Sequence, residues 1–129
     1  MSLLRTRRIL VLDDDEAQRD VLSEILGLEG AEVLNATTWE EAARLLSDGA
    51  DLVLMDLHGV DADRLMRHLR ATGSAPKVLL VSGDATLRQQ AERLQVDRWL
   101  AKPYDVDQLL DAVKDLLAPA EGGPEHPSP

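Results

Sequence analysis

Five short apolar runs recur along the chain, and a stretch with helical periodicity separates each run from the next. The runs lie at residues 9–12 (ILVL), 31–36 (AEVLNA), 52–55 (LVLM), 78–81 (VLLV) and 99–101 (WLA). Runs this short favour strands, and uninterrupted apolar runs are typical of strands covered on both faces. Their alternation with helices predicts an α/β fold: a doubly wound (βα)₅ parallel sheet with helices on both faces.

The stretches between the runs carry start and stop signals for helices. Two apolar stripes at helical spacing are formed by Ala17, Val21, Ile25 and Leu28, and by Val106, Leu109, Leu110, Val113, Leu116 and Leu117. Three residue pairs have the spacing of a capping box: Asp15 with Gln18, Thr38 with Glu41, and Asp105 with Gln108. Glycines stand where helices are predicted to end, at Gly30, Gly49 and Gly73.

Composition excludes several classes of protein. With 129 residues the chain is long enough for one domain with a real core. Its 24 acidic and 14 basic residues give a net charge of −10, which would repel a nucleic-acid backbone. The chain has no cysteine, so disulfides and thiolate metal sites are excluded. No apolar run reaches membrane-spanning length and no signal peptide is recognisable, so we expect a cytoplasmic protein without membrane contact.

We expect the folded domain to span residues 8–118. Residues 1–7 are predicted to be disordered or vector-derived, and the Pro- and Gly-rich segment 119–129 to be a disordered tail or the start of a linker. The last predicted helix carries aspartates at 107, 111 and 115 on its outer face. Such a face is well solvated, which favours a monomer.

Ligands of open α/β sheets bind outside the carboxyl ends of the strands, so the residues there are the candidates for a site. They are Asp13, Asp14 and Asp15 after the first strand, Asp56 after the third, Ser82 and Gly83 after the fourth, and Lys102 and Pro103 after the fifth. Three adjacent carboxylates repel one another and would also repel a phosphate. A dinucleotide site, which needs a glycine-rich turn after the first strand, is therefore excluded.

Such carboxylates can serve as ligands when a hard divalent cation lies among them and neutralises their charge. Mg²⁺, or Mn²⁺ in its place, takes oxygen ligands and shares its remaining positions with water and phosphate oxygens. We expect Asp13 and Asp14 to hold the cation, while Asp15 caps the helix that follows. Asp56 ends the predicted central strand and is the best-placed nucleophile, since a carboxylate attacking phosphorus gives an acyl phosphate.

The other two polar groups suit the same chemistry. Lys102 can act as a point charge toward a phosphoryl group, and Ser82 can donate a hydrogen bond to it. Each residue also has an ordinary structural explanation, as a cap, a turn residue or a solvated lysine. The specificity lies in the whole set, with each residue type on the expected strand.

With these motifs in place, the chain resembles the receiver domain of two-component response regulators. The resemblance runs from Arg8 to Leu117 and rests on "ILVLDDDEAQRDVLSEIL", "DLVLMDL", "VLLVSGD" and "WLAKPYDVDQLLDAV". It implies a flavodoxin-like strand order 2-1-3-4-5 and a phosphorylation-dependent switch rather than an enzyme with an external substrate. It also implies a sensor histidine kinase or phosphotransfer protein as phosphoryl donor, and a downstream effector or C-terminal output domain as the reader of the last two strand–helix units.

The resemblance assigns a role to each site residue. Asp56 would be the phosphoacceptor, Asp13 and Asp14 the acidic pair at the metal, and Ser82 the switch hydroxyl. Lys102 would be the phosphate-binding lysine. The remaining assignments are a backbone carbonyl ligand to the metal at His58, the aromatic switch position at Trp99, and a typically cis peptide bond at Pro103.

Two loops depart from the pattern of the family. The segment "DLHGVDADRLMRHLR" after Asp56 is about two residues short, lacks the usual Pro and has Ala62 where the family has Gly. The spacing from Ser82 to Lys102 is also about two residues short. The rim positions around Gly83 are occupied by His58 and Asp84, which we expect to pair across the site and tune hydrolysis. Unchanged dephosphorylation after replacing each with Ala would contradict that expectation.

Two alternatives remain open at this point. In a haloacid dehalogenase-type phosphatase, "DDD" would supply Asp13 as the nucleophile and Asp15 as the acid. That family, however, requires a further acidic pair on a strand after the lysine, and here only a helix is predicted there. A pseudo-receiver would use the same fold to bind partners without phosphorylation. The presence of all five core site residues argues against it, and the two short loops keep it open.

Overall fold

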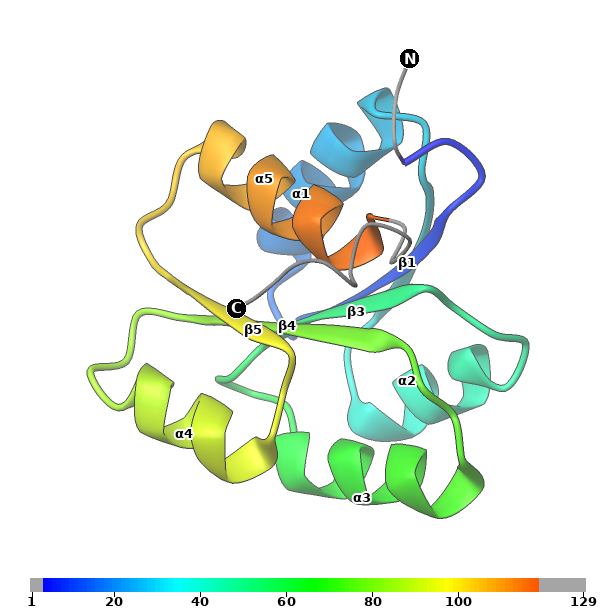
Figure 1. The fold of residues 1–129 in the computed structure, drawn as a ribbon, viewed down its shortest axis with the longest axis vertical. Coiled ribbons are helices and arrows are strands. Elements are labelled where there is room, and N and C mark those ends of the chain that lie inside the picture. The colour runs from blue at the N-terminus through cyan, green and yellow to red at the C-terminus, as the bar shows by residue number, and fades with distance from the viewer. Residues whose placement is uncertain (1–3, 119–129) are drawn as a thin grey trace, which may run out of the picture.

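The computed structural model describes residues 4–118, which form five strands and five helices in strict alternation (Figure 1). The strands are β1 (Arg8–Leu12), β2 (Glu32–Ala36), β3 (Leu52–Asp56), β4 (Lys77–Ser82) and β5 (Arg98–Ala101). The helices are α1 (Glu16–Leu28), α2 (Trp39–Leu46), α3 (Ala62–Thr72), α4 (Leu87–Leu94) and α5 (Val106–Leu117). The predicted (βα)₅ fold is confirmed.

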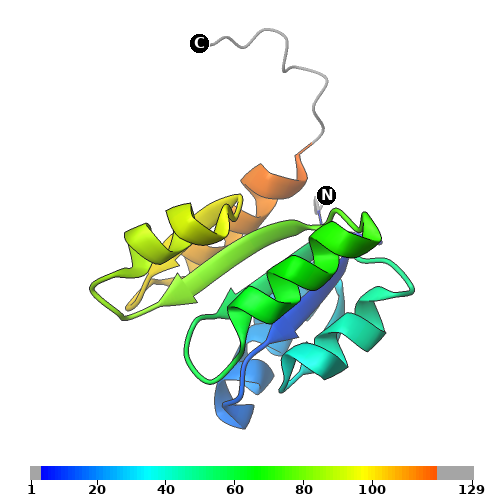
Figure 2. The same cartoon turned by 90° about the horizontal axis from the view of Figure 1, so that it is seen from below.

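The strands form one parallel sheet in the order β2-β1-β3-β4-β5 (Figure 2). β3 is central, and all five of its residues are buried. Its last residue, Asp56, pairs in register with Val81, which directly precedes Ser82. β1 lies on the other side of β3, with Leu12 in register with Met55. The carboxyl ends of β1, β3 and β4 therefore meet at one edge of the sheet.

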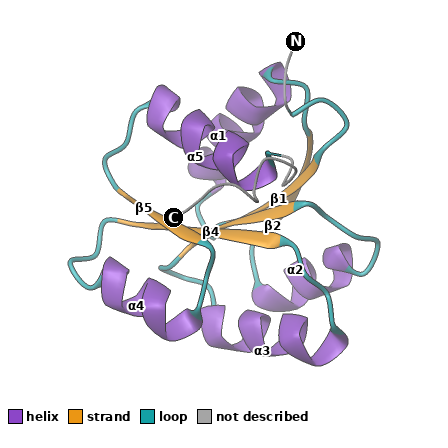
Figure 3. Ribbon diagram, in the orientation of Figure 1, coloured by secondary structure: helices purple, strands orange, loops and turns teal. Residues whose placement is uncertain are grey.

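The helices cover the sheet in two layers (Figure 3). Helices α1 and α5 lie on one face, and α2, α3 and α4 lie on the other. A separate apolar cluster fills each interface: Leu22, Leu26 and Leu109 contribute to the first, and Ala42, Leu65 and Leu87 to the second. A core on both faces explains why the strands read as uninterrupted apolar runs.

The predicted helix starts are confirmed, with one difference in detail. The side chains of Asp15, Thr38 and Asp105 accept hydrogen bonds from the first turns of α1, α2 and α5. Only at α5 is a reciprocal capping box formed, between Asp105 and Gln108. At α2 the Glu41 carboxylate instead accepts from the backbone N–H of Thr37, at 2.9 Å.

The apolar stripe of α1 that the sequence indicates packs only in part against the core. Leu22 and Leu26 are the buried residues of α1 and Ile25 packs against the same cluster, whereas Val21 is 54% exposed and Leu28 is 80% exposed. Val21 and Ile25 form one apolar stripe on this helix, and Leu22 and Leu26 form another beside it. The stripe of Leu22 and Leu26 is the one that is buried against the sheet.

The expectation of disorder before residue 8 also fails where the structure describes that segment. Leu4 is completely buried and belongs to the apolar cluster under α1 and α5. The backbone N–H of Arg7 bonds the carbonyl of Leu4 at 3.0 Å, closing a turn before β1. The predictions for residues 1–3 and 119–129 lie outside the described residues. Within 4–118, none of the helices combines the length and the apolar character that crossing a membrane requires.

Candidate functional site

Three buried polar side chains mark the edge where β1, β3 and β4 end. Asp13, Asp56 and Ser82 are 3%, 4% and 0% exposed, and they are the buried polar residues of the described chain. Buried carboxylates and hydroxyls require partners, because an unpaired polar group loses its hydration. Their partners define the site.

Lys102 pairs with Asp56 across the end of the sheet. Its Nζ donates to Asp56 Oδ2 at 2.5 Å, and the other carboxylate oxygen, Oδ1, accepts from the backbone N–H of His58 at 2.9 Å. Burial opposes the charge of Lys102, but the hydrogen bond and the negative charge of Asp56 outweigh it and raise the pKa of the lysine. The ammonium therefore stays charged beside the carboxylate.

Asp13 is in a less favourable electrostatic position. Burial raises the pKa of Asp13, and the negative charges of Asp56 and Asp14 raise it further. The hydrogen bond from the backbone N–H of Asp15 to Asp13 Oδ1, at 2.9 Å, and the charge of Lys102 offset part of this shift. The carboxylates of the site are thus close enough to repel one another, as the sequence predicted.

Asp14 is exposed and lies against Gly59 in the loop after β3. Gly59 has a φ of +79°, and a Cβ built on it would lie 1.8 Å from Asp14 Oδ2. The carboxylate of Asp14 therefore fills the space that a side chain at position 59 would need. This contact joins the loop after β1 to the loop after β3.

The oxygen donors at this edge suit a hard cation. Among residues 4–118 no three His, Asp or Glu side chains form a group that could hold a metal ion. Mg²⁺, however, usually takes one or two protein carboxylates and completes its shell with water, carbonyl and phosphate oxygens. The mutual repulsion of Asp13, Asp14 and Asp56 and the room for the Asp14 carboxylate above Gly59 fit such a cation.

The ends of β4 and β5 complete the site. The backbone N–H of Lys102 bonds the carbonyl of Ser82 at 2.9 Å, so the lysine and the hydroxyl residue are held side by side. Ser82 Oγ accepts from the backbone N–H of Asp84 at 2.9 Å, which leaves its own proton available for donation. The peptide bond between Lys102 and Pro103 is cis, as expected.

The rim residues also lie where the sequence placed them. His58 Nε2 is 3.9 Å from Asp84 Oδ2, so the two side chains face each other across the site. Hydrogen bonds from the backbone and the hydroxyl of Thr86 hold the pKa of Asp84 below its usual value, with a smaller contribution from His58. Gly83 lies at the same rim, and a Cβ there would be in ordinary contact with Lys102.

Trp99 is not brought into this site. It lies on β5 in register with Leu80 and is 42% exposed. The position is the one that the sequence assigned to an aromatic switch, on the face formed by the last two strand–helix units.

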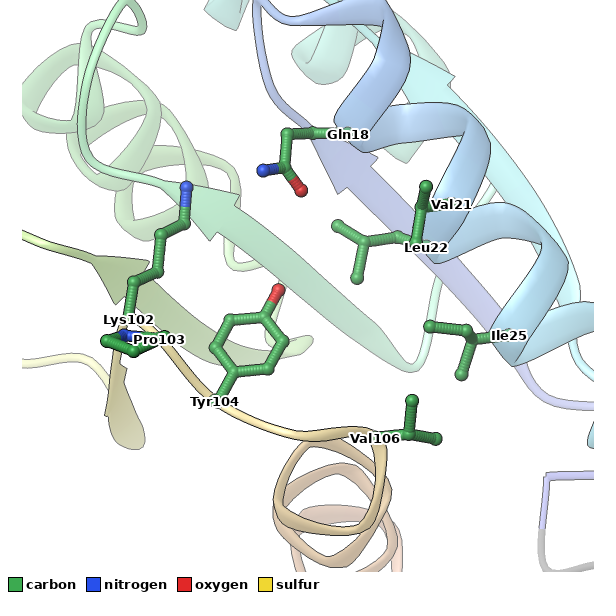
Figure 4. Close-up of a pocket in the computed structure, with 8 residues that line it drawn as sticks. All are labelled: Gln18, Val21, Leu22, Ile25, Lys102, Pro103, Tyr104 and Val106. Carbon is green, nitrogen blue, oxygen red and sulfur yellow. The ribbon is translucent and has the colours of Figure 1, made fainter.

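An apolar groove of about 550 Å³ opens beside Lys102, between α1 and the start of α5 (Figure 4). Val21, Leu22 and Ile25 project from α1 toward Tyr104 and Val106. Lys102 lines one end of the groove as well as the carboxylate site. Val21 and Ile25 therefore form, with the buried Leu22, the α1 wall of this groove.

Three residues of the site were not found from the sequence. Arg19 donates from Nη1 to the backbone carbonyl of Asp13 at 2.7 Å. Tyr104 lies in the groove, and burial raises the pKa of its hydroxyl. Gly59 contacts Asp14. Arg19 could have been predicted from its position in the first turns of α1, directly after the acidic cluster. Nothing in the sequence indicates the contact at Gly59.

Known proteins resemble this chain in sequence and in fold. The sequence profile of the response regulator receiver domain matches residues 9–114. The transcriptional regulatory protein CpxR of Klebsiella pneumoniae is 33% identical over 116 residues, which are 85% of this chain and 49% of that protein. Sporulation initiation phosphotransferase F of Bacillus subtilis is 27% identical over 119 residues, covering 88% of this chain and 96% of that protein. The chain thus spans about half the length of CpxR and nearly all of the phosphotransferase.

Solved structures confirm the fold. The signal receiver domain of a putative LuxO repressor protein from Vibrio parahaemolyticus has a TM-score of 0.77 at 16% identity, covering 87% of this chain and 90% of that one. A response regulator receiver protein from Burkholderia phymatum has a TM-score of 0.76 at 22% identity, covering 87% and 95%. At these identities the likeness concerns the fold alone.

Proposed function

Because this chain belongs to the response regulator receiver domain family of two-component signalling, we propose that Asp56 accepts a phosphoryl group and thereby switches the domain between two states. Receivers are signalling modules, not enzymes that turn over an external substrate. The observation that carries the proposal is the placement of Asp56: it is buried at the end of the central strand, with Lys102 on one oxygen and the His58 backbone on the other.

The donor is a phosphohistidine on a sensor histidine kinase or phosphotransfer protein. A carboxylate oxygen of Asp56 attacks phosphorus, a P–O bond forms, the P–N bond breaks, and the freed imidazole takes up a proton. Lys102 moves from the carboxylate to a phosphoryl oxygen, and the Ser82 hydroxyl donates a hydrogen bond to another phosphoryl oxygen.

Asp13 and Asp14, with Asp56 and the backbone carbonyl of His58, would hold Mg²⁺ or Mn²⁺. When bound, the cation would neutralise charge on the carboxylates and on the transferred group. Asp13 is kept in place for this role by the backbone bond from Asp15 and by Arg19 on its own carbonyl.

The partner that supplies the phosphoryl group docks, in this proposal, on the groove between α1 and α5. The groove has apolar walls, remains open in the described chain and reaches Lys102 at one end, so a helix lying in it can present a histidine to Asp56. Phosphorylation then draws in Ser82 and Lys102 and shifts the face formed by β4, α4, β5 and α5, including Trp99, toward a downstream partner. We place this exchange in the cytoplasm.

Incubation with acetyl phosphate tests the proposal. Intact mass should rise by one phosphoryl group in the presence of Mg²⁺, but not in EDTA and not in the Asp56→Asn variant. No mass gain by the folded wild-type chain would contradict it.

A second candidate function is that of a pseudo-receiver, a module with this fold that binds partners without being phosphorylated. The two shortened loops beside Asp56 and Ser82 are the feature that favours it. The same experiment separates the two, because a pseudo-receiver gains no mass under any condition.

A further inference from the structure

Gly59 lies in an unusually close contact with a charged side chain. A Cβ built on it would lie 1.8 Å from Oδ2, 2.2 Å from Cγ and 2.7 Å from Oδ1 of Asp14. Each separation is shorter than a real Cβ contact, so the carboxylate as a whole occupies the place of a side chain at position 59. The carboxylate can lie there only because residue 59 has none.

The contact brings two groups of the proposed cation site together. The carbonyl of His58 is bonded to the nitrogen of Gly59, so the Asp14 carboxylate and this carbonyl lie beside the same residue. Asp14 has no hydrogen-bond or ion-pair partner among the interactions that the structure shows, which leaves its oxygens free for a ligand. Asp56, two residues before His58, is tied to the same turn by its bond to the His58 N–H at 2.9 Å.

The other glycines with positive φ do not share this feature. Gly49 and Gly73 would have nothing within 4 Å of an added Cβ, and Gly30 would meet only Arg5, with the backbone nearest. Gly73 ends α3 with a φ of +74°, close to the +79° of Gly59. Replacing Gly73 by Ala therefore reproduces the backbone strain of the same change at 59 without the collision.

We propose that Gly59 is a positioning residue for the cation site. Its missing side chain admits the Asp14 carboxylate beside the His58 carbonyl. A methyl group at 59 displaces that carboxylate and weakens Mg²⁺ binding while every ligand stays in the chain. The inference rests on the proposed function, because it takes the cation site as its premise.

The test is the Mg²⁺ dependence of the melting temperature, which reports cation affinity without requiring phosphorylation. The Mg²⁺ concentration at half-maximal stabilisation should rise about tenfold or more in Gly59→Ala, a loss typical of displaced supporting contacts at metal sites. It should stay at the wild-type value in Gly73→Ala. In EDTA both variants should lose stability, since they share the φ strain, and the comparison with Gly73→Ala removes that shared loss from the Mg²⁺ effect.

An Asp14→Ala background shows whether the effect passes through Asp14. There the added methyl has no carboxylate to displace, so Gly59→Ala should shift the Mg²⁺ midpoint less than it does in the wild type. An unchanged midpoint in Gly59→Ala, or an equal loss in both backgrounds, would overturn the inference and leave the proposed function intact. A wild-type chain that Mg²⁺ does not stabilise would overturn the cation site itself.

Discussion

At the scale of single residues, Asp13 is held where the fold opposes its charge. It is 3% exposed, and the carboxylates of Asp56 and Asp14 act on it together with burial to raise its pKa. Lys102 cannot relieve all of this repulsion, because its ammonium is paired with Asp56. The residue is therefore better explained by a function than by stability.

Replacing Asp13 by Asn should stabilise the chain in EDTA. The raised pKa means that the charged form is disfavoured on folding, so the penalty is absent below the ordinary aspartate pKa of 3.8 and complete once pH exceeds the folded value. Near neutral pH we expect the melting temperature to rise on the order of 3–5 °C, as about 1 kcal/mol gives in a small domain. The gain should disappear toward about pH 4 or below.

A pH series of thermal unfolding checks this prediction. The exposed Asp20 of α1 provides the control, since Asp20→Asn removes a charge outside the buried cluster. Equal stability of wild type and Asp13→Asn at neutral pH would contradict the account of the site.

The sequence predicted some residues of the site and missed others for a physical reason. Asp56, Ser82 and Lys102 could be placed because the carboxyl ends of parallel strands share an edge. The contact of Gly59 with Asp14 depends on the path of two loops, which spacing along the chain does not determine. Loop geometry of this kind was visible only in the structure.

At the scale of elements, α1 shows where pattern reasoning failed. Val21 and Leu22, and then Ile25 and Leu26, are adjacent apolar residues, so two stripes at helical spacing overlap on the helix. Periodicity alone does not say which one faces the sheet. Leu22 and Leu26 do, while Val21 and Ile25 of the other stripe line the groove beside Lys102.

A charge placed in that groove should block the phosphodonor without unfolding the domain. Val21 is 54% exposed, so Val21→Asp should change stability by no more than about 0.5 kcal/mol. Phosphotransfer from a phosphorylated histidine kinase that labels the wild-type chain should slow by about tenfold or more. Labelling by acetyl phosphate, which needs no docking, should persist.

Leu28 supplies the matched control for this experiment. It is 80% exposed on the same helix and does not line the groove. The Leu28→Asp variant should be phosphorylated by the kinase at the wild-type rate. Equal slowing of phosphotransfer to both variants would place the docking surface elsewhere.

At the scale of the whole molecule, the order of the strands brings the side chains of the site together. The alternation of runs predicted a parallel sheet, but the order β2-β1-β3-β4-β5 followed from the resemblance to receivers, because no residue pattern states which strands are neighbours. That order places β1 and β4 on either side of β3. Asp13 and Ser82 thereby flank Asp56 at the edge where we propose phosphoryl transfer.

We propose that Asp56 carries the phosphoryl group and that none of the three aspartates after β1 does. Borohydride reduction of the acetyl phosphate-treated chain converts an aspartyl phosphate to homoserine, and trypsin then separates the candidates into peptides 9–19 and 45–64. Our account predicts homoserine at position 56, in the second peptide, and only when Mg²⁺ was present. Homoserine at position 13, 14 or 15, or in neither peptide, would contradict it.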